Sequence, residues 1–138
     1  MGLFENKKGL ILGIANDSSI ASIIAKEIMR QGGMIGVTHL PDRPDDEKKK
    51  NTMRVRKALK GFDDQVKFLT PLDVQDDANI QSVMDEAGRE FGEIDFLLHS
   101  VAFASLDDLR VPTLGCSREG FKMAMDVSAY SLIAVANA

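Results

Sequence analysis

Short apolar segments of strand type alternate with segments of helical periodicity along most of the chain. The strand-type segments are residues 9–12, 34–38, 66–69 and 96–99, and the helical segments between them are residues 18–31, 45–60 and 76–91. Strands that alternate with helices in this way pair in parallel, and right-handed crossover helices cover both faces of the sheet. The sequence therefore predicts an α/β, doubly wound parallel sheet with three αβα layers. A strand order of 3-2-1-4 would create a switch point between the first and fourth strands, where such folds bind ligands.

Apolar residues at helical spacing predict which face of a helix is buried. In the first helix this stripe is Ile20, Ile23, Ile24 and Ile28, and in the third it is Ile80, Val83, Met84, Ala87 and Phe91, after a cap at Asp76 or Asp77. The segment 45–60 begins with acids and ends with bases, an order that favours a surface helix along its dipole. Residues 96–99 are continuously apolar up to His99, which is typical of a central parallel strand.

The C-terminal region is predicted to hold an irregular loop at residues 102–116 and then a long helix from about Ser117. A loop of this length inside a compact domain is usually functional or mobile. The apolar residues of the last helix are expected to pack in the core or against another subunit. They are Phe121, Met125, Leu132 and Val135.

The turn after the first strand is small and polar. Gly13 follows the strand and a helix opens at Ser18 or Ser19, so unpaired backbone N–H groups and the positive end of a helix dipole converge. A phosphate suits such a place. Only one glycine is fixed in the turn, and the dinucleotide fingerprint with three glycines is absent. This stretch alone leaves both phosphate binding and a plain structural turn open.

Length, charge and composition exclude several kinds of binding partner and site. The 138 residues suffice for one domain over residues 1–138, and a net charge of -4 argues against nucleic acid as a partner. The single cysteine, Cys116, excludes an internal disulfide, and no His or acid cluster has the spacing of metal ligands. Because no apolar run approaches membrane-spanning length and no apolar signal core is visible, we expect a cytoplasmic protein without a membrane partner.

Two tips of small residues flank the predicted switch point, namely residues 13–15 and 100–102. Small side chains at both tips let a flat cofactor approach the backbone. Asp73, after the third strand, would either accept the exocyclic amine of an adenine or serve as a turn aspartate. The second strand ends in His39 and Leu40 rather than in an acid. Beyond them, Asp42 favours NAD and Arg43 favours NADP, so the choice stays open.

Two other side chains have reactive chemistry. His99 could act as a general base, but a hydrogen-bonded structural histidine is the favoured interpretation at the end of a buried strand. Neither histidine of the chain lies near Cys116 in sequence, so we interpret Cys116 as a small loop residue rather than as a nucleophile.

Motifs spread over nearly the whole chain resemble the enoyl-acyl-carrier-protein reductases of bacterial fatty-acid synthesis, a divergent branch of the short-chain dehydrogenases with a Rossmann-like fold. The motifs are Gly13-Ile14-Ala15 with Ser19-Ile20-Ala21, then Asp73-Val74, then His99-Ser100-Val101-Ala102-Phe103-Ala104, then Arg118-Glu119-Gly120-Phe121 leading to Ser128-Ala129-Tyr130-Ser131. The spacing from glycine to serine and the stretch from His99 to Ala104 are more specific to this branch than a generic nucleotide fold would be.

The resemblance implies an NAD site and an acyl-substrate edge. Residues 13–15 would lie along the pyrophosphate and ribose, Ser19 and Ile20 would bind the pyrophosphate, and Asp73 and Val74 would hold the adenine. Ser100, Val101 and Ala102 would line the adenosine and nicotinamide side, and Ala104 would lie at the substrate edge. Leu40 stands where many members carry a glutamine beside the adenosine, and the segment from Asp42 to Phe62 is longer than in the commonest members.

The family's catalytic tyrosine and lysine, six residues apart, would fall beyond Ala138, and Tyr130 does not match them. We therefore expect an N-terminal part of a longer NADH-dependent enoyl reductase, truncated after the fourth strand and the helix that follows. Its substrate would be an enoyl-acyl-carrier-protein, and it would form a homotetramer. The alternatives are another short-chain dehydrogenase acting on a carbonyl, which the tyrosine-to-lysine spacing would distinguish, and a non-catalytic nucleotide-binding domain.

Overall fold

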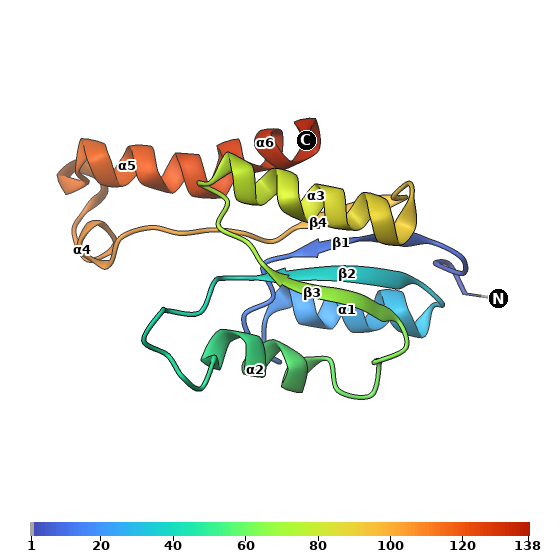
Figure 1. The fold of residues 1–138 in the computed structure, drawn as a ribbon. Helices are drawn as coiled ribbons and strands as arrows, with labels where there is room; N and C mark the ends of the chain where they lie inside the picture. Colours follow the sequence, from blue (N-terminus) through green and yellow to red (C-terminus); the bar gives the residue numbers. More distant parts are fainter. Residues whose placement is uncertain (1) are drawn as a thin grey trace.

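The computed structural model describes residues 2–138 and contains one four-stranded parallel sheet (Figure 1). Its strands are β1 (Lys8–Leu12), β2 (Met34–His39), β3 (Val66–Pro71) and β4 (Phe96–His99). They lie in the order β3-β2-β1-β4, and every neighbouring pair is parallel. The predicted doubly wound parallel sheet is confirmed. The carboxyl ends of β1 and β4 therefore lie side by side at the point where the winding reverses.

Helices connect the strands and cover both faces of the sheet. They are α1 (Ile20–Arg30), α2 (Lys50–Ala58), α3 (Asp77–Phe91), the short α4 (Leu106–Leu109), α5 (Arg118–Met125) and α6 (Ser131–Asn137). A 3-10 turn (Thr113–Gly115) precedes α5, and a π-helical turn (Asp126–Tyr130) joins α5 to α6. None of the helices in residues 2–138 is long and apolar enough to cross a membrane.

Alternate side chains of β1 serve two separate cores. Ile11 points toward the layer of α1 and α2, whereas Leu10 and Leu12 point toward the layer of α3 and α6. Figure 1 shows these two layers on opposite faces of the sheet. All three β1 side chains are fully buried, so β1 is the centre of the described fold. The expected three-layer αβα architecture is confirmed.

The predicted buried stripe of α1 is largely wrong. Ile20, Ile23 and Ile24 are 72%, 59% and 36% exposed, and only Ile28 of that set is buried. The helix instead turns its small residues toward the sheet, and the buried set is Ala21, Ser22, Ala25, Ile28 and Met29. Small side chains allow close approach of the helix to the sheet. The buried hydroxyl of Ser22 is satisfied, because it donates to backbone carbonyl oxygens.

The stripe predicted for α3 is confirmed at four of its positions, because Ile80, Val83, Ala87 and Phe91 are buried while Met84 is half-buried. The predicted cap at Asp76 is also confirmed. Its carboxylate accepts the backbone N–H groups of Ala78 and Asn79. In the last helical segment only Val135 of the expected apolar set is buried, and Phe121, Met125 and Leu132 are exposed.

The charged segment 45–60 forms a shorter helix than predicted. Residues 45–49 make turns, Lys49 adopts a left-handed conformation with φ of 46°, and α2 begins only at Lys50. The cause is the side chain of Asp46, whose carboxylate accepts the N–H groups of Lys48 and Lys50. An aspartate that binds backbone donors in this way favours a turn or a cap over a helix interior.

The position of β4 differs from the prediction of a central strand. Within residues 2–138, β4 pairs only with β1 and forms one edge of the sheet. All of its side chains are half-buried. Its apolar run is thus covered on the side of β1 but not on the other side of the described sheet.

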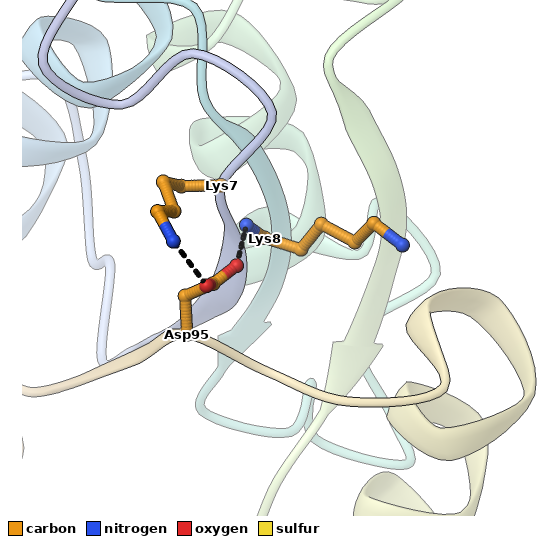
Figure 2. Close-up of polar contacts among 3 residues, drawn as sticks. All are labelled: Lys7, Lys8 and Asp95. Carbon is orange, nitrogen blue, oxygen red and sulfur yellow. Dashed lines mark hydrogen bonds and ion pairs between the residues drawn. The ribbon is translucent and has the colours of Figure 1, made fainter.

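Asp95 joins the beginnings of β1 and β4 (Figure 2). One carboxylate oxygen accepts the Lys7 ammonium at 2.7 Å and the other accepts the Lys8 backbone N–H at 2.9 Å. These hydrogen bonds lower the pKa of Asp95 from its ordinary value of 3.8. A carboxylate with a lowered folded pKa stabilises the fold above its ordinary pKa, and that contribution is lost as pH falls through the folded pKa.

We expect Asp95→Asn to lower the urea midpoint of unfolding slightly but measurably near neutral pH, because a charged acceptor is lost. The difference from wild type should begin to shrink as pH falls below about 4, the ordinary pKa of the carboxyl, and should vanish below the lowered folded pKa, where the folded wild-type carboxylate is itself protonated. Asp63→Asn is the matched control, since Asp63 is exposed and makes no side-chain hydrogen bond or ion pair within residues 2–138. A difference that stays constant with pH would contradict the assigned role of the charge.

Candidate dinucleotide site

The tips of β1 and β4 touch at Gly13. This residue has φ of +89°, and a Cβ atom placed on it would lie far inside van der Waals distance of the Ser100 carbonyl oxygen. The Gly13 N–H donates to the Thr38 carbonyl oxygen at 3.3 Å, which also ties the tip to the end of β2. Only glycine satisfies both the left-handed backbone and the close approach. The turn thus presents bare backbone where the three strand ends meet.

The loop between Gly13 and α1 is held by its own polar groups. The Asn16 side chain accepts the Ser18 N–H, and the Ser19 hydroxyl donates to the Asn16 carbonyl oxygen at 2.7 Å. Ser19 is the N-cap residue of α1, as predicted, but its hydroxyl makes no cap to the helix. The backbone N–H groups of Ile20 and Ala21 consequently have no hydrogen-bond partner within residues 2–138. Free N–H groups at a helix start suit an anion.

A cavity of about 540 Å³ opens beyond the carboxyl ends of the strands. Most residues predicted to bind a cofactor line it: Gly13, Ile14, Ala15, Leu40, Asp73, Val74, Ser100, Val101 and Ala102. Ser19 and Ile20 do not line this cavity, and neither does Ala104. The residues predicted from sequence thus come from the ends of all four strands, and the fold brings them together around one cavity.

Further residues line the cavity that the sequence had not singled out. They are Asn16, Thr38, Asn51, Arg54, Leu72, Gln75, Met123 and Val127. His39 and Phe103, named above without a binding role, line the cavity as well. Asn51 and Arg54 lie three residues apart on α2, a spacing that places them on one face of a helix. That spacing is a signal in the sequence, but it is informative only once the start of α2 is known.

Asp73 forms the turn considered from sequence and also lies at the cavity wall. Its carboxylate accepts the Gln75 N–H at 2.9 Å and so forms a turn, while the residue is exposed at the cavity wall. The Asn79 side chain fixes its backbone by accepting the Asp73 N–H at 2.7 Å. A carboxylate fixed by a turn is already oriented before any ligand arrives.

The end of β2 carries an exposed apolar side chain beside a buried histidine. Leu40 is 71% exposed, whereas His39 is 3% exposed. The Nδ1 atom of His39 lies 2.8 Å from the Leu40 carbonyl oxygen, and its Nε2 atom lies 3.3 Å from the Thr52 hydroxyl. His39 thus fixes the path of the chain at the cavity, and Leu40 offers an apolar surface to a flat ligand.

The loop after β4 is held against the last helical segment. The Ser128 hydroxyl accepts the Phe103 N–H at 3.0 Å and donates to the Phe103 carbonyl oxygen. The Ser131 hydroxyl donates to the Val127 carbonyl oxygen, so the Nε2 atom of His99, 2.7 Å away, donates to Ser131. His99 is therefore the hydrogen-bonded structural histidine that the sequence favoured.

Other candidate chemistry is absent from the described part of the chain. No group of His, Cys, Asp and Glu side chains in residues 2–138 has the arrangement of a metal site. Desolvation raises the pKa of Cys116, and the nearby Asp108 carboxylate raises it further, so this thiol is not activated as a nucleophile.

A doubly wound sheet with a glycine tip and a cavity at its switch point defines a Rossmann-type dinucleotide-binding fold. Residues 13–138 match the family model described as enoyl-(acyl carrier protein) reductase, and the chain belongs to this family.

Individual relatives agree with this assignment. The chain is 39% identical over 135 residues to the NADH-dependent enoyl-[acyl-carrier-protein] reductase of Aquifex aeolicus, covering 98% of this chain and 47% of that protein. It is 36% identical over 133 residues to the NADPH-dependent enzyme of Staphylococcus aureus, covering 96% of this chain and 49% of that protein. The reductase structure of Anaplasma phagocytophilum in complex with NAD matches with a TM-score of 0.85 at 33% identity, covering 99% of this chain and 48% of that one. The chain spans about half the length of the curated relatives it matches.

Proposed function

We propose that this chain is the dinucleotide-binding part of a protein that reduces trans-2-enoyl-acyl-carrier-protein to acyl-carrier-protein in fatty-acid elongation, with NADH as a reductant. One observation carries the proposal: the cavity at the switch point is lined by the ends of all four strands, and bare backbone faces it at Gly13. The dinucleotide supplies the hydride that passes to the β-carbon of the enoyl thioester. Family membership and the NAD complex of the Anaplasma relative support this choice of reaction and ligand.

The residues present fit the parts of such a cofactor. In the proposal, the adenine lies between Leu40 and the turn of Asp73 and Val74. The pyrophosphate lies over residues 13–15 and reaches the free N–H groups of Ile20 and Ala21. The nicotinamide side lies along residues 100–102, and the acyl chain enters past Ala104. The enolate oxygen formed by hydride addition would be stabilised by the family's tyrosine and lysine, outside these residues.

The proposal includes a homotetramer in the cytoplasm. Apolar side chains remain exposed along α5 and α6, among them Phe121, Leu132 and Ile133. Such a patch on consecutive helices is typical of a subunit contact. Light scattering of the purified protein measures the assembly directly, and a monomer would contradict this part of the proposal.

Titration with NADH, followed by the change in the fluorescence of the dinucleotide, tests the proposed ligand. We expect saturable binding at one site per chain. Another short-chain dehydrogenase, one that acts on a carbonyl, would give the same NADH titration. A non-catalytic nucleotide-binding domain would also bind NADH, but it would not oxidise it. A folded protein that shows no change in NADH fluorescence would contradict the proposal.

A further inference from the structure

Arg54 lines the β2 end of the cavity, and no hydrogen bond or ion pair within residues 2–138 engages its side chain. Arg54 lines the main cavity together with Thr38 and Leu40, which mark the end of β2. It also lines a smaller hollow of about 270 Å³ that adjoins it. Its side chain takes part in no ion pair and no hydrogen bond found within residues 2–138. Arg54 is therefore a free, exposed cation next to the ribose end of the proposed ligand.

Asp42 is the acid that could repel a phosphate at this end of the cavity, but its carboxylate is already hydrogen-bonded within the protein. The Asp42 carboxylate accepts the Asn51 N–H at 2.6 Å and the Thr52 N–H at 3.3 Å, and it also accepts the Thr52 hydroxyl. Desolvation raises the pKa of Asp42, but these hydrogen bonds outweigh it and the net pKa is lowered. Asp42 does not line either hollow. It orders the start of α2 and so holds Arg54 in place, rather than accepting a ribose hydroxyl.

The smaller hollow has an excess of positive charge. Arg43, Lys50 and Arg54 line it together with two acids, Asp45 and Asp46. Asp46 is occupied by the backbone N–H groups of Lys48 and Lys50, as a turn and cap residue. An anion placed in the hollow would therefore meet cations from both the β2 loop and α2.

We propose that Arg54 binds the 2′-phosphate of an adenosine ribose, so that the site takes NADPH at least as tightly as NADH. The inference rests on the proposed function, and it deepens that function by naming the choice of reductant. In this fold an acidic residue near the end of the second strand hydrogen-bonds the ribose hydroxyl, or an arginine nearby accommodates the 2′-phosphate. A planar guanidinium can donate two parallel hydrogen bonds to one phosphate group.

The test compares Arg54→Ala with wild type in the full-length protein, by titration with NADPH and with NADH. Loss of a charge-assisted hydrogen-bonded contact should raise the Kd for NADPH by about 10- to 100-fold. The Kd for NADH, which has no 2′-phosphate, should rise by less than about threefold. In wild type, the Kd for NADPH should also increase more steeply with salt than the Kd for NADH, because ions screen the added charge.

Arg56→Ala is the matched control, because Arg56 is an exposed arginine on the same helix that lines neither hollow. It should leave both Kd values unchanged. Wild-type protein that binds NADH but binds NADPH more than tenfold more weakly would overturn the role of Arg54 and leave the proposed function intact. An equal effect of Arg54→Ala on both dinucleotides would do the same. Failure of both dinucleotides to bind folded wild-type protein would overturn the proposed function and this inference together.

Discussion

Gly13→Ala is expected to destabilise the fold by roughly 3–5 kcal/mol and to remove dinucleotide binding. Two effects add at this position. An alanine at φ of +89° is strained, and its Cβ would displace the carbonyl of Ser100 at the neighbouring strand tip. Because both tips line the cavity, the displacement also changes the surface on which the dinucleotide is proposed to lie. Urea unfolding and NADH titration measure the two effects separately.

Gly61→Ala separates backbone strain from the loss of close approach. Gly61 has φ of +93°, nearly that of Gly13, but no atom lies within 4 Å of the position of an added Cβ. We expect Gly61→Ala to cost only about 1 kcal/mol and to leave NADH binding unchanged. Equal losses of stability in the two variants would show that contact between the strand tips contributes nothing.

Ile28→Ala should lower the free energy of unfolding by about 2–4 kcal/mol, because it leaves a cavity between α1 and the sheet. Ile28 is 6% exposed and belongs to the core that includes Ile11 and Val37. The same change at Ile23, which is 59% exposed on the same helix, should alter stability by less than about 0.5 kcal/mol. Chemical denaturation of the two variants compares them directly.

This pair of variants also tests the orientation of α1. The sequence places both isoleucines in one apolar stripe, whereas the structure buries only one of them. If Ile23→Ala were as damaging as Ile28→Ala, the helix would have to be rotated toward the isoleucine face, and the described packing of Ala21 and Ala25 would be wrong.

Elements with one strong periodic signal could be predicted well from the sequence. The four strands follow from the alternation of apolar runs and helices, and the face of α3 follows from a stripe of large side chains. The face of α1 could not be predicted by the same rule. Its buried face consists mainly of small residues such as Ala21 and Ala25, and apolar size alone favoured the isoleucines.

The candidate site divides in a similar way. The strand tips at Gly13 and Ser100 could be expected at the cavity, since parallel strands bring their carboxyl ends to one edge. Arg54 could not, because its place depends on where α2 begins. That start depends on the turn that Asp46 makes with Lys48 and Lys50, and on contacts of Asp42 with residues nine and ten positions later in the chain. Side-chain caps of this kind are decided by tertiary geometry and leave little trace in periodicity.

Reduction of an enoyl thioester by the full-length protein is the decisive test of the proposed reaction. We expect oxidation of NADH or NADPH that depends on crotonyl thioester and yields the saturated acyl thioester, one molecule for each dinucleotide consumed. A protein that binds dinucleotide and reduces a carbonyl substrate, but leaves the carbon–carbon double bond of the enoyl thioester intact, would contradict the account and favour a different short-chain dehydrogenase.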